Sequence, residues 1–189
     1  MIRNIFIIAL LSLIFSSASF AEEPTKVKNF TLPDYNGVKH SLTDYKNAKV
    51  VVMMFIATQC PISNAYNTRM VSLYNDYESK NIVFVGVNAN KQESIEEIKQ
   101  HAADHAFEFT ILKDDKNMIA DKFGATVTPE IYVINSSLDI LYHGRVDDSR
   151  RDSGVASQDL RRALDEILAG KQVSVSETKA FGCTIKKVE

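Results

Sequence analysis

Residues 49–63 read KVVVMMFIATQCPIS, and this stretch decides the fold class. After Lys49, every residue to position 56 is apolar and the run is rich in β-branched side chains, which is typical of a strand buried on both faces of a parallel sheet. Pro61 is favoured in a first helical turn. Apolar residues follow it at helical spacing to about residue 80: Ile62, Tyr66, Met70, Leu73 and Tyr77. The stretch therefore predicts a central strand followed by a helix, with Cys60 at the junction.

The segments on either side predict further strands and helices in a regular order. Before the stretch, residues 30–38 predict a hairpin with its turn at Asn36-Gly37, and residues 41–45 predict a helical turn. After it, the pattern predicts strands at 82–87, 107–112, 130–134 and 140–143, and helices at 94–106, 117–123 and 160–168. This order predicts an α/β fold with a mixed central sheet flanked by helices and an N-terminal hairpin extension.

The first 21 residues have the pattern of a secretory signal peptide. Arg3 carries the only charge, and an apolar run of 11 residues, broken only by Ser12, follows at 5–15. Ser19 and Ala21 supply the small residues of a cleavage site. An uncleaved membrane anchor is the alternative, but the run is short against the roughly 20 residues of a spanning helix. We therefore expect cleavage before Glu22, an exported protein that is periplasmic or secreted, and no membrane contact after cleavage.

Composition and charge place the rest of the chain among ordinary folded proteins. Of 189 residues, 45% are hydrophobic, and 22 basic residues against 24 acidic ones give a net charge of −2. This balance lacks the positive excess of a nucleic-acid binder, so no nucleic-acid partner is expected. We expect one domain over residues 22–170 and a polar C-terminal tail over residues 171–189.

The two cysteines, Cys60 and Cys183, are the main chemical feature of the predicted mature chain. Export would place them where disulfides form. As a permanent bridge around 122 intervening residues, they would stabilise the fold by about 4–5 kcal/mol in the chain-entropy treatment. As a redox pair, Cys60 would benefit from its place before a helix, where backbone N–H groups lower the pKa of a thiol. The sequence leaves both readings open, together with an intermolecular bridge.

Three segments resemble the thioredoxin superfamily: MMFIATQCPIS at 53–63, ATVTPEIY at 125–132, and the order of elements around them. Within that superfamily, FTLPD at 30–34 and the following Asn36-Gly37 are similar to the redoxin branch, the alkyl hydroperoxide reductase/thiol-specific antioxidant proteins, and to its peroxiredoxin-like members. The resemblance runs from about residue 27 to 169. YHGRVDD at 142–148 and GCTIK at 182–186 add weaker similarity.

The resemblance implies a role for each candidate site residue. Cys60 would be the attacking thiol and Cys183 the resolving thiol, on a flexible tail whose residues 181–185 could dock as an extended segment against the sheet. Thr128-Pro129 would form a cis-proline loop that faces Cys60 and, with Pro61, shapes a substrate groove. The candidates for tuning the thiol are Thr58, Ser63, Arg145 and Asp147.

Two departures from the family patterns limit the implied activity. Ser63 stands where thioredoxins carry their second cysteine, so a local Cys-x-x-Cys shuttle is excluded. Ala57 and Met53 stand where peroxiredoxins place a Thr or Ser and a Pro, and Thr58 is one position away. We therefore expect a thiol–disulfide oxidoreductase acting on a thiol or disulfide partner protein or on a small oxidant. The alternatives are a thiol-dependent peroxidase and a non-catalytic binding module stapled by Cys60 and Cys183.

The histidines and the charged run at 147–152 carry weaker signals. His101 and His105 have a spacing that can hold a metal, but no third ligand accompanies them, so a solvated helix face is favoured and no metal or cofactor is expected. A copper chaperone would need paired cysteines close in sequence. His143 is either an ordinary edge residue or a base or metal ligand near Cys60. The charged run predicts a solvated loop.

Overall fold

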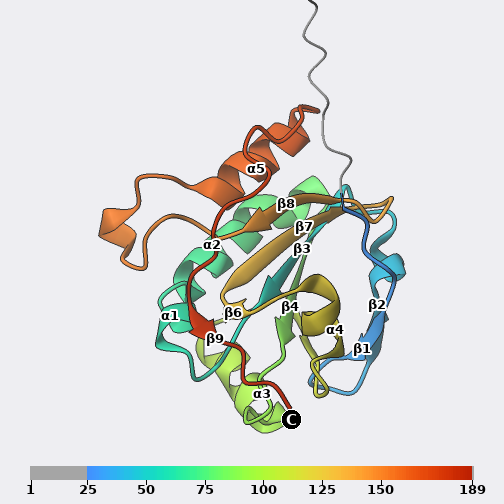
Figure 1. Ribbon diagram of the computed structural model, residues 1–189, viewed down its shortest axis with the longest axis vertical. Coiled ribbons are helices and arrows are strands. Elements are labelled where there is room, and N and C mark those ends of the chain that lie inside the picture. Colours follow the sequence, from blue (N-terminus) through green and yellow to red (C-terminus); the bar gives the residue numbers. More distant parts are fainter. Residues whose placement is uncertain (1–24, 189) are drawn as a thin grey trace, which may run out of the picture.

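The computed structural model describes residues 25–188 and places a five-stranded mixed sheet at the centre (Figure 1). The predicted signal peptide at 1–21 lies outside the described residues. The strand order is β5-β4-β3-β7-β8. Strand β3 is parallel to β4, which is parallel to β5, whereas β7 is antiparallel to both β3 and β8. The bounds are β3 Val50–Phe55, β4 Ile82–Asn88, β5 Thr110–Lys113, β7 Glu130–Asn135 and β8 Ile140–Gly144.

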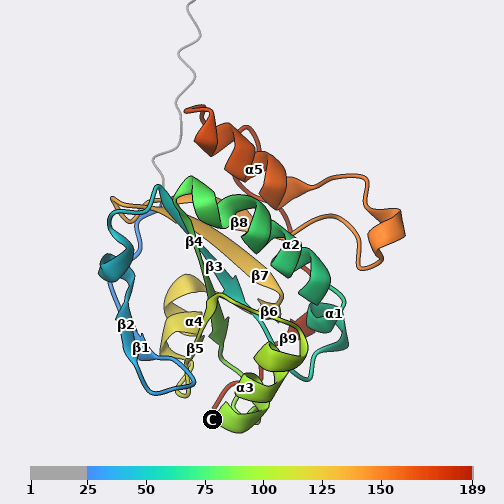
Figure 2. The ribbon, with the colours of Figure 1, turned by 180° about the vertical axis from the view of Figure 1, so that it is seen from behind.

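Strand β3 is apolar along its whole length because both faces of the sheet are covered. Val50, Val52 and Met54 point into a cluster with helices α2, α3 and α5. The intervening residues point into a second cluster with helix α4 and the N-terminal hairpin. Helix α4 lies in front of the sheet in Figure 1, and α2 lies in front of it in the reverse view of Figure 2. The covering elements are β1 Thr31–Pro33, β2 Lys39–Ser41, the 3-10 turn η1 Leu42–Tyr45, α2 Asn67–Tyr77, α3 Ile95–Asp104, α4 Met118–Phe123 and α5 Asp159–Leu168.

The predicted helix from Pro61 to about residue 80 is interrupted. It consists of α1 (Pro61–Asn64), α2, and a final 3-10 turn η2 (Glu78–Lys80). The backbone N–H of Tyr66 donates to the carbonyl of Ser63, three residues back, and this tighter turn separates α1 from α2. The predicted apolar stripe is confirmed from Tyr66 onward, since Tyr66, Met70, Leu73 and Tyr77 are all buried.

The predicted third strand begins later than expected. The N–H of Phe107 donates to the carbonyl of Ala102, so this residue closes the end of α3 instead of starting a strand. Ala106 has a positive φ of 54°, which turns the chain out of the helix. Helix α3 therefore ends at Asp104, before the predicted residue 106, and β5 begins at Thr110.

The C-terminal tail lies along the domain, and residues 181–185 dock as the extended segment that the sequence allowed, although the tail as a whole was predicted to be flexible. Figure 1 shows the tail, in red, running from α5 to the C-terminus near α3. It first lies beside β8, where His143 exchanges backbone hydrogen bonds with Ser176 and Thr178. It then forms β9 (Cys183–Thr184), which pairs antiparallel with β6 (Val127–Thr128).

Two glycines allow the tail to approach the domain closely. Gly144 has a φ of +147°, and a Cβ there would overlap Thr178 of the tail. A Cβ on Gly182 would overlap the carbonyl oxygen of Thr128. Both contacts therefore need a residue without a side chain.

The N-terminal hairpin lies beside the outer edge of the central sheet. Asp34, beside the hairpin, forms a bridge to Leu112 on the outer edge of β5. Within residues 25–188, no helix has the length and apolar character needed to cross a bilayer.

Candidate active site around Cys60 and Cys183

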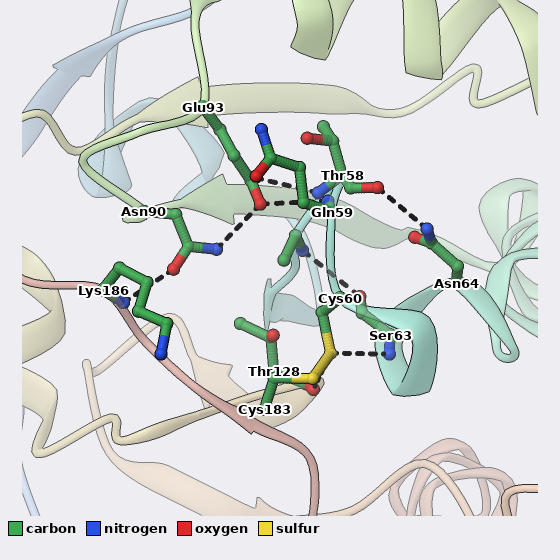
Figure 3. The surroundings of a disulfide bond; sticks show 11 residues. Thr58, Gln59, Cys60, Ser63, Asn64, Asn90, Glu93, Thr128, Cys183 and Lys186 are labelled. Atoms are coloured by element: carbon green, nitrogen blue, oxygen red, sulfur yellow. Dashed lines mark hydrogen bonds between the residues drawn. A yellow bond between two sulfur atoms is a disulfide. The ribbon is translucent and has the colours of Figure 1, made fainter.

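The two cysteines form a disulfide between the start of α1 and the tail (Figure 3). Cys60 is the N-cap residue of α1 and its side chain is buried, with 5% relative exposure. Cys183 lies in β9, and the two Cα atoms are 5.9 Å apart. The structure thus joins the predicted attacking and resolving thiols within one chain.

Ser63 supports the Cys60 sulfur directly. Its backbone N–H donates to the sulfur over 3.2 Å, and its hydroxyl accepts the N–H of Ala57 over 3.2 Å. A backbone N–H directed at sulfur stabilises a thiolate, which is the nucleophilic form of cysteine. At the position of the second thioredoxin cysteine, this chain therefore carries a fully buried serine that fixes the loop around Cys60.

The Thr128-Pro129 peptide bond is cis, as the resemblance implied, and it faces Cys60. The carbonyl oxygen of Thr128 lies 3.4 Å from the Cys60 sulfur. In the reduced protein this oxygen is placed to accept a hydrogen bond from the thiol. Pro61 is exposed at the first position of α1, and its part in a substrate groove stays a prediction.

Glu93 is a buried carboxylate that the sequence analysis missed. It accepts the backbone N–H groups of Thr58 and Gln59 over 2.8 and 3.0 Å, so it holds the two residues before Cys60. It also accepts the side-chain amides of Asn88 and Asn90 over 2.5 and 3.2 Å. Glu93 follows a polar stretch just before the α3 capping box, and no local pattern distinguishes it from a solvated residue.

Asn90 connects this carboxylate to the tail. Its side-chain oxygen accepts the N–H of Lys186 over 2.8 Å (Figure 3). The N–H of Lys91 donates to the carbonyl of Lys186. Lys113 lies beneath, with its amine donating to Asn88 and to the Asn90 carbonyl. Burial lowers the pKa of Lys113. One buried polar network therefore supports both the Cys60 loop and the segment after Cys183.

Glu93→Gln is expected to lower the free energy of unfolding by about 1–3 kcal/mol, because a glutamine offers one acceptor oxygen to donors that now share two. The amide group would turn its own N–H₂ toward buried N–H groups. The measurement is urea unfolding of the oxidised protein. Glu96→Gln is the matched control, since it makes the same chemical change on the exposed side of α3. Equal unfolding midpoints for both variants would contradict the role of Glu93.

Thr58 contributes its backbone to the site, whereas its hydroxyl is not engaged. Its carbonyl accepts the side-chain amide of Asn64 over 2.8 Å. The hydroxyls of Thr58 and Thr128 are buried and have no hydrogen-bond partner among residues 25–188. A tuning role for the Thr58 hydroxyl stays a prediction.

Arg145 and Asp147 form ion pairs away from the cysteines. Arg145 donates to Asp159 over 2.7 Å, and Arg69 donates to Asp147 over 2.5 Å. Within residues 25–188, neither side chain forms a hydrogen bond to Cys60 or Cys183, and their tuning role stays a prediction. The charged run was predicted to be solvated, but Asp147 is buried because Arg69 compensates its charge.

His143 helps to hold the loop that faces Cys60 through a contact with Glu130. Its ring stacks on Tyr132 and pairs with the buried Glu130 over 2.7 Å. The other carboxylate oxygen of Glu130 accepts the N–H groups of Thr126 and Val127. Burial alone would raise the pKa of Glu130, but these hydrogen bonds hold its pKa below the usual value. The pair therefore fixes the strand β6 on which the tail lies.

The other histidines do not form a metal site in the described part of the chain. His101 contacts the side-chain amide of Asn67. Burial and the neighbouring His105 lower the pKa of His101. Across residues 25–188 there is no group of three or more His, Cys, Asp or Glu side chains that could hold a metal ion.

Comparison with known proteins assigns the chain to a class. The AhpC/TSA family matches residues 24–143, which is more than half of the 189 residues, and the chain belongs to this family. The predicted redoxin relationship is thereby confirmed.

The chain is also similar to individual known proteins. Thiol-disulfide oxidoreductase ResA of Halalkalibacterium halodurans is 26% identical over 127 residues, covering 67% of this chain and 70% of the relative. The crystal structure of hypothetical protein SMc02350 from Sinorhizobium meliloti is 28% identical, with a TM-score of 0.82, and covers 89% of this chain and 96% of that chain. A putative thiol:disulfide interchange protein DsbE from Chlorobium tepidum has a TM-score of 0.65 at 21% identity, over 78% and 98% of the two chains. This last likeness concerns the fold alone, and the predicted thioredoxin-like fold is confirmed.

Proposed function

We propose that this protein is an exported thiol–disulfide oxidoreductase in which Cys60 is the attacking thiol and Cys183 the resolving thiol. The observation that carries the proposal is the Cys60–Cys183 disulfide, set between the Ser63 N–H and the Thr128 carbonyl. The name of the relative ResA supports disulfide exchange as the chemistry. The predicted signal peptide supports export.

The proposed cycle transfers two electrons through two exchanges. In the reduced protein, the Cys60 thiolate attacks one sulfur of a partner disulfide, and the partner's other sulfur leaves as a thiolate. The Cys183 thiolate then attacks the Cys60 sulfur, which forms the observed disulfide and releases the partner as a dithiol. The partner is reduced, the protein is oxidised, and an external thiol restores the starting form.

Peroxide reduction is the second candidate, since the family includes thiol-specific antioxidant proteins. In this chain Ala57 and Met53 replace the residues that orient a peroxide in the peroxiredoxins that it resembles, and the nearby Thr58 hydroxyl is unpartnered among residues 25–188. Disulfide exchange is therefore the preferred proposal. A reduced protein that reacts faster with hydrogen peroxide than with oxidised glutathione would reverse this preference.

The decisive measurement is the reduction potential of the Cys60–Cys183 pair. The protein is equilibrated in buffers with defined ratios of reduced to oxidised glutathione and then alkylated. Mass spectrometry quantifies its reduced and oxidised forms. We expect a potential between about −120 and −270 mV, the range of cycling thiol oxidoreductases. A value below about −300 mV would mark a permanent bridge and contradict the proposal.

A further inference from the structure

We infer that Asn90 and Asn117 are positioning residues for the second exchange: they hold the chain just after Cys183, so that this cysteine stays beside Cys60 when the disulfide is open. This role rests on the proposed function, in which Cys183 is the resolving thiol. It makes the part of the tail that carries Cys183 a short segment anchored at both ends.

Asn90 is a buried residue that binds the tail three positions after Cys183. Its side-chain oxygen accepts the backbone N–H of Lys186 over 2.8 Å (Figure 3). Its side-chain amide donates to the buried carboxylate of Glu93 over 3.2 Å, which leaves the oxygen facing the tail. The backbone N–H of the neighbouring Lys91 donates to the Lys186 carbonyl over 2.8 Å. Lys186 is therefore bound through both of its main-chain groups.

Asn117 binds the tail two residues further on. Its side-chain oxygen accepts the backbone N–H of Val188 over 2.7 Å, and its side-chain amide donates to the carbonyl of Ala89. Asn117 is buried and has a φ of 56°, a left-handed conformation that asparagine tolerates better than most residues. Both asparagines bind main-chain groups of the tail, and none of these contacts involves a sulfur atom. Their hold on the tail is therefore available to the reduced protein as well.

The chain before Cys183 is anchored on strand β8. The backbone N–H of His143 donates to the Ser176 carbonyl, and the His143 carbonyl accepts the N–H of Thr178, each over 2.9 Å. Residues 179–185 therefore run between two points that are bound to the domain. A thiol on a short tether of this kind has a high effective concentration at its partner.

This effective concentration acts on the second exchange of the proposed cycle. When Cys60 carries a mixed disulfide with glutathione, the Cys183 thiolate attacks the Cys60 sulfur. A bond forms between the two cysteines, the bond to glutathione breaks, and glutathione leaves as a thiolate. With the disulfide closed, the tail is held covalently. With it open, a tail that has lost an anchor can move away, so loss of the anchor favours the reduced form and slows the second exchange.

The test removes single N–H donors of the tail from the full chain. Lys186→Pro removes the N–H that Asn90 accepts, and Val188→Pro removes the N–H that Asn117 accepts. Lys186→Ala and Val188→Ala are the matched controls, because they change only exposed side chains and keep both N–H groups. Reduced protein is mixed with oxidised glutathione, and mass spectrometry of acid-quenched samples follows formation and decay of the Cys60–glutathione adduct.

Each proline variant is expected to resolve the adduct about tenfold more slowly than the wild type, because a buried asparagine oxygen is left without its donor. The equilibrium constant for the Cys60–Cys183 bond against glutathione should fall by the same factor, which is a reduction potential about 30 mV less negative. Formation of the adduct should not slow, since attack by Cys60 uses no group of the tail. The alanine controls should match the wild type.

The domain side of one anchor gives a check that does not depend on proline. Asn90→Ala removes the same hydrogen bond as Lys186→Pro, so the double variant should slow decay of the adduct by less than the two single effects combined. Circular dichroism of the reduced proteins verifies that each variant is folded. Full additivity in the double variant would contradict the assignment of Asn90.

Two results separate this inference from the proposed function. Folded proline variants with the wild-type potential and the wild-type decay of the adduct would overturn the positioning role and leave disulfide exchange intact. A wild-type protein that forms no Cys60–glutathione adduct and no Cys60–Cys183 bond with oxidised glutathione would overturn both.

Discussion

Replacing Cys60 by serine is expected to slow exchange with small disulfides by about a thousandfold or more, since loss of the nucleophile removes the first covalent step. A serine hydroxyl does not ionise near neutral pH, and only a thiolate attacks a disulfide efficiently. The Ser63 N–H that now contacts the Cys60 sulfur would contact the hydroxyl instead, so the fold should be retained. The measurement is the rate of reaction of the reduced protein with oxidised glutathione, with circular dichroism to check the fold.

Cys183→Ser is the matched control because it exchanges the same atom in the other cysteine. This variant should still attack at Cys60 and then accumulate the Cys60–glutathione adduct, which mass spectrometry detects. If instead Cys60→Ser retains the wild-type rate and Cys183→Ser loses it, the two proposed roles are reversed.

The same Cys183→Ser variant is expected to be about 5 kcal/mol less stable than the oxidised wild type. The bond joins residues separated by 123 positions, and closing so long a loop removes much conformational entropy from the unfolded chain. Urea unfolding of both oxidised proteins measures the difference.

Reduced wild-type protein provides the control for this stability difference. It lacks the bond but keeps Cys183, so it should unfold together with the variant. If the oxidised and reduced wild-type proteins unfold at the same urea concentration, the bond does not constrain the unfolded chain as expected.

Much of the fold was predictable because its signals are local and repeated. The apolar run before Cys60 is fully buried only if both faces of the sheet are covered. In the structure α2 packs on one face and α4 on the other. The break at Tyr66 and the late start of β5 were not predictable, because each depends on one backbone hydrogen bond. Docking of residues 181–185 as an extended segment was anticipated, but the tail's partners Asn90 and Asn117 were not, because they are distant in sequence.

The site was predictable where a motif marks it. Cys60 and Thr128-Pro129 were identified by their flanking residues, and the structure brings them together. The pairing of Cys60 with Cys183 remained open, because two cysteines alone do not define a bond. Glu93 was missed because its burial depends on Asn88 and Asn90 at the end of β4, and a glutamate in a polar stretch gives no sign of such an environment.

The tail also covers an outer edge of the central sheet, which bears on association between copies of the chain. An open outer strand is a template for pairing with other molecules and for aggregation. Here Asp34 bridges to the outer edge of β5, and Glu177 bridges to His143 on the outer edge of β8. The contact on β8 lies upstream of Cys183 and uses only main-chain groups, so we expect Ser176 and Thr178 to shield this edge whether or not the disulfide is formed. The arrangement separates the segment that covers the sheet edge from the segment that carries the proposed resolving thiol.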